Sequence, residues 1–436
     1  MNAPVWRRLS ALTAALGLAS LLAVGCAPKS SDGGSGKDEK TGTVRVWLFK
    51  ELNNKPKQKV IARAVDRFEK KHDDVKVDVR YIAAETRAAK LKGALNDPES
   101  APDVIEYGNT DTAGYVKDGA LEDVSWEVER WTSIVDTDAT AKESVTVDDK
   151  LYGAPFYVGV RALYYRTDVF KELGLKPPKT LAEVRETAKK VRSAKPDMYG
   201  MAVGGANTFV AMPYVWANGG DMARVGAKTY DSTINSEAAR KGIEEYSSLF
   251  KDDNCPARKC AKWDGTEATD AFANGKAGMV VGGDFSRQVM DDGKVKGKYG
   301  VVPLPGKKKG SIAPAFAGGN NIGVMKSSSH RTLSVGLMKE FAGKRTQGEM
   351  HKAMGFLPTF SDVRDKATRG KPFFEPFAKT LDAKTRFVPV SPGWNEIDAS
   401  LVLPTMFQEV ITNKKKVGAA AGDAEKKMNK IFSKNQ

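Results

Sequence analysis

Cysteine and histidine are scarce in this sequence, which narrows the chemistry that the chain can perform. Its 436 residues include three cysteines and three histidines. A zinc site needs several close Cys or His ligands, whereas His72, His330 and His351 are far apart in the sequence. The sequence also lacks a nucleophile elbow, a zinc-binding histidine pair and a phosphate-binding loop. We therefore expect no metal, no cofactor and no catalytic residues, although 54 acidic residues leave room for the carboxylate pair of a secreted glycoside hydrolase.

Long apolar runs are absent after residue 25. No segment of this later part of the chain approaches 18 uninterrupted apolar residues. Residues 1–25 have the layout of a signal peptide, with Arg7-Arg8 followed by the apolar run Leu9 to Val24. That run is short and rich in small residues, which does not suit a membrane span. We expect export, and a membrane attachment only at the start of the chain.

The segment Ala23-Val24-Gly25-Cys26 resembles a bacterial lipobox, although such boxes prefer leucine where Ala23 stands. This resemblance implies that Cys26 carries a diacylglycerol, and two acyl chains suffice for stable anchoring. Ordinary secretion with a leftover thiol is the alternative. Residues 26–42 are polar and rich in Gly, Ser and Lys, so we expect a flexible tether holding the protein on the outer face of the cell membrane.

The charge of the chain is strongly positive, at +15. A basic surface can bind nucleic acid, acidic polymers or anionic lipids. Here the lysines alternate with acidic residues, as in Lys37-Asp38-Glu39-Lys40, and form no Arg-rich stripe with interleaved aromatics. We interpret them as a solvated surface and expect no nucleic-acid partner.

The other two cysteines stand close together, in Asn254-Cys255-Pro-Ala-Arg-Lys-Cys260. In an oxidising compartment they can close a small disulfide loop. A redox-active pair is more typically Cys-x-x-Cys. A structural disulfide is the favoured interpretation.

Alternating and helical patterns predict a β-α-β start. Thr43 to Phe49 and Val75 to Tyr81 alternate as strands, and Gln58 to Lys71 has a helical apolar face. We expect a further helix over Ala88 to Leu95 and a buried strand over Asp103 to Tyr107. Such a start favours a sheet covered by helices, with ligands beyond the strand ends. Thr180 and Glu183 are spaced as a capping box before a helix at Leu181 to Ser193.

An ordered set of motifs across the chain resembles the extracellular solute-binding proteins of the maltose-binding type, which serve ABC importers. The motifs are Pro102-Asp-Val-Ile105, Gly119-Ala-Leu121, Leu151-Tyr-Gly-Ala-Pro155, Ala162 to Phe170, Pro177-Pro-Lys-Thr180, Ala217-Asn-Gly-Gly220, Ala271 to Met279, Gly318-Gly-Asn320 and Gly355-Phe-Leu-Pro-Thr359.

The resemblance implies an α/β fold of the two-lobed periplasmic-binding-protein-like type (type II), with the lobes joined by hinge strands. The implied lobes are residues 43–154 plus 302–346 and residues 155–301 plus 347–436, with crossings near 152–158, 301–305 and 346–359. It further implies a monomer that closes on a carbohydrate and delivers it to the permease subunits of an ABC importer.

A sugar needs aromatic rings against its C–H faces and planar polar groups for its hydroxyls. By resemblance, the ligand-binding residues of the first lobe and the first crossing are Phe49, Glu51, Tyr107, Asn109, Thr110, Asp111, Tyr157 and Arg161. Those of the second lobe are Asn207, Phe209, Asp284, Phe285 and Trp394. Arg161 stands where the family often has a carboxylate, and an arginine there binds neutral hydroxyls or an acidic sugar.

Other interpretations stay open at this point. Phe209 and Phe285 can equally be core rings, since most large aromatics are buried for packing. A surface lectin or a partner of a sensor would have the same cleft without any transport role.

Overall fold

The computed structural model describes residues 38–435, apart from residues 52, 84–85, 98–99, 227–228 and 252–253. The expected signal peptide, Cys26 and most of the expected tether lie outside the described residues.

The predicted β-α-β start is confirmed. Strands β1 (Gly42–Phe49) and β2 (Val75–Ile82) pair in parallel and are joined by helix α1 (Lys55–Glu69). The helix begins three residues before the expected Gln58, because Pro56 in its first turn suits a helix start. Helix α2 (Arg87–Asn96) and strand β3 (Val104–Gly108), which also pairs in parallel with β1, follow as expected.

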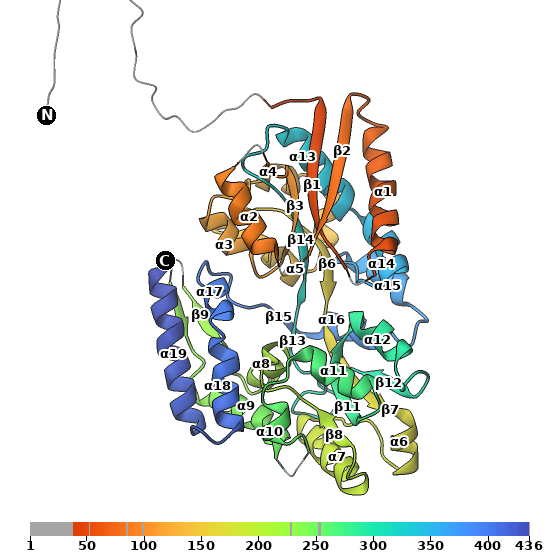
Figure 1. The fold of residues 1–436 in the computed structure, drawn as a ribbon, viewed down its shortest axis with the longest axis vertical. Coiled ribbons are helices and arrows are strands. Elements are labelled where there is room, and N and C mark those ends of the chain that lie inside the picture. The colour runs from red at the N-terminus through yellow and green to blue at the C-terminus, as the bar shows by residue number, and fades with distance from the viewer. Residues whose placement is uncertain are drawn as a thin grey trace, which may run out of the picture. The chain divides into compact units, whose positions relative to one another are not determined.

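Two later strands complete this first sheet, whose order is β2-β1-β3-β14-β6. Strand β14 (Gly318–Val324) runs antiparallel to both β3 and β6 (Ala154–Gly159). In Figure 1, helices α1 and α13 (Arg331–Ala342) lie beside the strands of this sheet. The remaining elements of this region are α3 (Thr112–Lys117), α4 (Ser125–Glu129), the 3-10 helix Thr132–Asp136, α5 (Ala139–Glu143), β4 (Thr146–Val147), β5 (Lys150–Leu151) and α14 (Lys344–Met354).

A second sheet, of order β12-β7-β11-β8, is built from the middle of the chain. Its strands are β7 (Arg161–Arg166), β8 (Tyr199–Ala202), β11 (Ala277–Gly283) and β12 (Tyr299–Val302). The chain leaves β6 of the first sheet and enters β7 of the second at Val160, a few residues after the expected boundary at residue 154. The buried residues on this side form their own hydrophobic clusters, separate from the cluster around β1 and α1.

Helices and short strands surround the second sheet (Figure 1). They are α6 (Thr167–Glu172), α7 (Leu181–Ala194), α8 (Thr208–Ala217), β9 (Ala223–Val225), β10 (Tyr230–Ser232), α9 (Glu237–Ser247), α10 (Ala257–Cys260), α11 (Gly265–Ala273), α12 (Arg287–Asp292), and the 3-10 helices Ser248–Phe250 and Asp284–Ser286. Later elements are β13 (Ala315–Phe316), α15 (Ser361–Thr368), α16 (Glu375–Ala383), β15 (Thr385–Arg386), α17 (Trp394–Ala399), α18 (Val402–Ile411) and α19 (Val417–Lys434).

The expected cap of α7 is half correct. The Thr180 hydroxyl accepts a hydrogen bond from the Glu183 N–H at 3.1 Å, as predicted. The returning bond is different, because the Glu183 carboxylate accepts from the Lys179 N–H at 2.8 Å. A complete capping box stands instead at Asp264 and Glu267, at the start of α11.

A disulfide joins Cys255 and Cys260, and both residues are buried in the cluster that contains α8 and α9. It closes the turn around α10 and lies among core residues. This placement agrees with a structural role.

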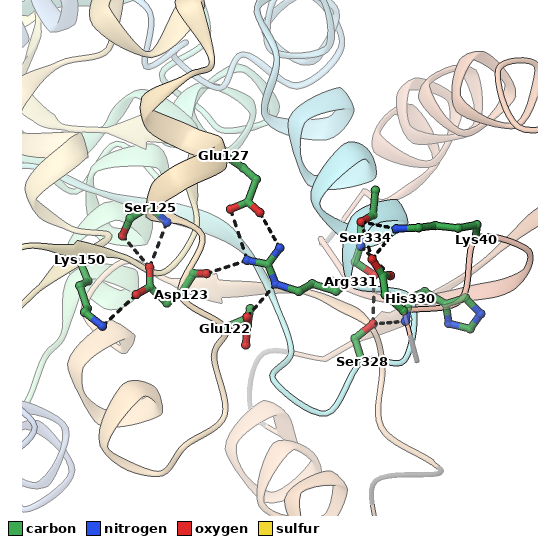
Figure 2. Close-up of polar contacts among 12 residues, drawn as sticks. Lys40, Glu122, Asp123, Ser125, Glu127, Lys150, Ser328, His330, Arg331 and Ser334 are labelled. Carbon is green, nitrogen blue, oxygen red and sulfur yellow. Dashed lines mark hydrogen bonds and ion pairs between the residues drawn. The ribbon is translucent and has the colours of Figure 1, made fainter. Parts of the chain in front are cut away.

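A charged cluster fixes the start of α13 against α4 (Figure 2). The Arg331 guanidinium donates to the Glu122 carboxylate at 2.8 Å, to the Asp123 carbonyl at 3.1 Å and to the Glu127 carboxylate. One side chain thus joins three acceptors of a neighbouring segment, and networks of this kind hold elements together better than isolated surface pairs do.

Within the described residues, no helix is both long enough and apolar enough to cross a membrane. The same part of the chain has no cluster of three or more His, Cys, Asp or Glu side chains placed to hold a metal ion.

Candidate functional site

A cavity of about 1030 Å³ is lined by residues that follow or belong to strands of both sheets. Glu51 comes after β1, Asn109 after β3, and Arg161 begins β7. Its size suits a small-molecule ligand of one to several rings. The strand ends of the two sheets therefore meet at one concave site, as expected for open α/β sheets.

The structure brings eight of the thirteen predicted ligand-binding residues to this cavity. They are Glu51, Asn109, Thr110, Tyr157, Arg161, Phe209, Asp284 and Phe285. Phe285 is 55% exposed, so its ring is not a core ring. Phe209 stacks on Phe316 with ring centroids 4.7 Å apart, and both rings belong to the cavity wall.

Five predicted residues do not line the cavity: Phe49, Tyr107, Asp111, Asn207 and Trp394. Tyr107 is buried, and its hydroxyl donates to the Tyr152 carbonyl at 3.2 Å. Phe49, Asp111 and Asn207 are likewise largely buried beside strand or helix ends. For these four, the positions lie near the site but the side chains pack elsewhere.

Trp394 is the clearest correction. It is only 3% exposed and belongs to a hydrophobic cluster with residues of α18 and α19, such as Leu403 and Met428. Pro392-Gly393 is typical of an exposed loop, but Trp394, which follows it, begins α17 and packs inward. The structure gives this tryptophan a packing role.

A buried charged network underlies one wall of the cavity. The Lys57 ammonium donates to Glu106 and to Glu51, each at 2.8 Å, and to the Phe49 carbonyl at 3.0 Å. Lys57 and Glu106 are almost fully buried. Burial alone lowers the pKa of Lys57, but attraction to Glu106 and Glu51 outweighs it, so the pKa is raised and the side chain stays charged.

Two further side chains connect this network to the cavity surface. The Glu106 carboxylate accepts from the Asn320 amide at 2.7 Å and from the Tyr157 hydroxyl at 3.2 Å. Burial, with the negative charge of Glu106, raises the pKa of Tyr157 well above its usual value. The Tyr157 ring stacks on Phe356 with centroids 4.3 Å apart. The wall thus presents planar polar groups and aromatic faces that are held in fixed orientations.

Another part of the cavity wall contains an arginine close to two aromatic rings. The Arg161 guanidinium lies 5.3 Å from the ring centroid of Phe209 and 5.7 Å from that of Phe285. Burial lowers the pKa of Arg161 to about 10, partly offset by attraction to Asp284. At neutral pH the guanidinium is still protonated.

Asp284 follows β11 and is hydrogen-bonded to Val160, the residue between β6 of the first sheet and β7 of the second. Its carboxylate accepts from the Val160 N–H at 3.1 Å, and its own N–H donates to the Val160 carbonyl at 3.2 Å. Burial raises the pKa of Asp284 to about 7, although backbone hydrogen bonds and Arg161 act in the opposite direction. This carboxyl group therefore changes charge near neutral pH.

Several residues of the candidate site were not predicted from the sequence, although some of them left a signal. Lys57 is spaced three, four and seven residues before Val60, Ile61 and Ala64, so it belongs to the buried face of α1. Glu106 interrupts an apolar strand, and Asn320 ends the Gly318-Gly-Asn320 motif. Phe356 of the cavity wall belongs to the Gly355-Phe-Leu-Pro-Thr359 motif, whereas His351 gave no signal beyond its type.

Comparison with known proteins agrees with this architecture. The sequence model of the family described as bacterial extracellular solute-binding protein matches residues 63–374. The diacetylchitobiose-binding protein of Streptomyces coelicolor is 26% identical over 440 residues, covering 97% of this chain and 98% of that protein. A maltooligosaccharide ABC transporter solute-binding lipoprotein of Streptococcus pneumoniae is 25% identical, covering 80% of each chain.

The fold is also that of solved structures. The sugar-binding protein MalE of Xanthomonas citri superimposes with a TM-score of 0.78 at 23% identity, covering 90% of this chain and 98% of that one. The predicted α/β periplasmic-binding-protein fold is thereby confirmed. Because the family model spans well over half of the sequence, this chain belongs to the bacterial extracellular solute-binding proteins.

Proposed function

We propose that this protein captures a mono- or oligosaccharide in the cavity and delivers it to the permease subunits of an ABC importer, without catalysing a reaction. The observation that carries the proposal is the composition of the cavity wall. The wall contains both the aromatic rings of Tyr157, Phe209 and Phe285 and the planar polar groups of Asn320 and Arg161. The names of two relatives, which refer to diacetylchitobiose and maltooligosaccharide, support the same ligand class.

The chemistry of sugars explains why these groups suit them. A pyranose ring has apolar C–H faces, which pack on aromatic rings, and hydroxyls around its edge, which pair with fixed donors and acceptors. The network of Lys57 and Glu106 holds Tyr157 and Asn320 in place before any ligand arrives. Such preorganisation lowers the entropy lost on binding.

We further propose that the two sheets belong to two lobes, the expected residues 43–154 plus 302–346 and residues 155–301 plus 347–436 with the first boundary moved to Val160, which close around the sugar. The change of sheet at Val160 supports a hinge there. Closure would be favoured only to the extent that the sugar binds the closed state more tightly than the open state.

A thermal-shift screen of the purified protein against mono- and oligosaccharides tests this function. A ligand present at 100 times its dissociation constant adds about 2.7 kcal/mol to the free energy of unfolding. We expect at least one sugar to raise the melting temperature. A rise with amino acids, peptides or metal ions, and with no sugar, would contradict the proposal.

Replacing Phe285 by alanine should weaken sugar binding about 10- to 100-fold, which corresponds to about 1.4–2.8 kcal/mol. The ring is 55% exposed and lines the cavity, so its removal takes away a stacking face and little core packing. Calorimetric titration of both proteins measures the change. Trp126→Ala is a matched control, because Trp126 is 63% exposed and lies on α4, away from the residues that line the cavity. Equal affinities of Phe285→Ala and wild type would remove Phe285 from the site.

We also propose that the protein is held on the outer face of the cell membrane by a lipid on Cys26. The lipobox-like sequence supports this location, as does the lipoprotein among the relatives. Cys26→Ser should release the protein from the membrane fraction into the soluble extracytoplasmic fraction. Fractionation followed by immunoblotting is the measurement, and unchanged membrane retention would refute the anchor.

A further inference from the structure

We propose that the cavity selects sugars that carry a carboxylate, and that Arg161 is the residue that receives this group. The inference rests on the proposed sugar-binding function and narrows it to one ligand class. It starts from an arginine that lacks the usual partner of an arginine.

Arg161 has no acceptor of its own in the described part of the chain. No hydrogen bond or ion pair joins its guanidinium to any of the residues described there, and its contacts are the faces of Phe209 and Phe285. Asp284 attracts it over a longer range, but its carboxylate hydrogen-bonds to the Val160 N–H instead. Five N–H donors therefore border the cavity without an acceptor.

Guanidinium donors without an acceptor are unfavourable in free energy unless a ligand supplies the acceptor. Partial burial beside two rings removes some of the water from the guanidinium, and cation–π contacts compensate for only part of the lost hydration. A carboxylate can accept two parallel hydrogen bonds from the planar guanidinium, and such charge-assisted bonds are about twice as strong as those to neutral groups. A hydroxyl or an amide carbonyl accepts from the same donors but leaves the charge uncompensated.

The other charges of the cavity wall leave no positive excess. Glu51 is paired with Lys57 at 2.8 Å, and Asp291 with Arg287 at 3.3 Å. Lys352 and Lys371 are exposed at the wall and have no ion pair among the described residues, whereas the only comparable carboxylates are Asp292 and Asp284. Glu51 and Glu106 share the single cation Lys57, so this cluster has one negative charge in excess, which offsets one of the exposed lysines. The preference for an anionic sugar therefore rests on Arg161 itself and not on the general charge of the wall.

The experiment compares acidic sugars with their carboxyl-reduced counterparts, which keep the same rings and linkages. Uronic-acid di- and trisaccharides prepared from pectin, alginate and hyaluronan, each beside its reduced form, are titrated into the purified protein by calorimetry. We expect at least one acidic sugar to bind ten- to a hundredfold more tightly than its reduced form. Arg161→Met should abolish this preference, because it should lower the affinity for the acidic sugar at least tenfold more than the affinity for the reduced form.

A control variant separates the local pairing from the general charge of the protein. Arg224→Met removes one positive charge from an exposed position on β9, outside the residues that line the cavity, and should preserve the preference. Circular dichroism and melting temperatures of both variants confirm that they are folded.

The possible results of this experiment distinguish a failure of the carboxylate preference from a failure of the proposed sugar-binding function. If reduced or other neutral sugars bind as tightly as acidic ones, the inference fails and the sugar-binding function stands. If acidic sugars are preferred but Arg161→Met keeps the preference, the role given to Arg161 is wrong. If no sugar of either kind binds, the proposed function itself fails.

Discussion

Lys57→Met is expected to lower the free energy of unfolding by about 3–5 kcal/mol. The substitution leaves the Glu106 carboxylate buried without its cation, and breaking one partner of a buried ion pair costs more than the pair contributes. Urea unfolding followed by circular dichroism measures the loss. Glu106→Gln in the Lys57→Met background should restore part of the stability, because it removes the uncompensated charge.

Lys59→Met is the control for this prediction. Lys59 lies two residues away on the same helix, is exposed, and has no ion pair among the described residues. Its replacement should change stability by no more than about 0.5 kcal/mol. A loss below about 1 kcal/mol for Lys57→Met would mean that water reaches Glu106 and that the network is not buried.

The second large effect is a pH dependence that Asp284 imposes on stability. Its pKa is about 7 in the folded protein, compared with about 3.9 for an unperturbed Asp. Below pH 4 the carboxyl group is protonated in both states, so it imposes no penalty. As the pH rises from 4 to 7 the unfolded state ionises first, and the folded state loses stability, by about 4 kcal/mol in total. Above pH 7 the loss is complete.

Asp284→Asn isolates this contribution from all other titrating groups. Asparagine keeps an acceptor for the Val160 N–H but carries no charge at any pH. The variant should therefore gain on the wild type between pH 4 and pH 7, and the difference should then level off. Urea midpoints at pH 4, 5.5, 7 and 8 measure it. A difference that does not vary with pH would show that Asp284 ionises normally.

The elements with strong local signals were predictable from the sequence. Alternation located β1 and β2, and helical spacing located α1, because both patterns follow from which side chains face the core. The cap at Thr180 was predictable for the same local reason. The other hydrogen bond of the predicted capping box does not form, because the Glu183 carboxylate accepts from the Lys179 N–H instead of the Thr180 N–H.

Residues of the candidate site could be predicted from the sequence only where they lie next to a strand end. Asn109, Arg161 and Asp284 stand beside strands whose ends meet at the cavity, so their positions followed from the family order. Whether a given side chain there points to ligand or to core depends on packing between distant segments. That is why Trp394, which packs against α19, was misplaced, and why Glu106 was overlooked inside an apolar strand.

The most direct test of the central claim is a calorimetric titration of the purified protein with the sugar that most raises its melting temperature, repeated with Phe285→Ala. We predict one binding site per chain in the wild type and an affinity about 10- to 100-fold lower in the variant. The absence of any sugar binding would contradict the proposed function. So would sugar binding that neither Phe285→Ala nor any other substitution in the cavity wall changes.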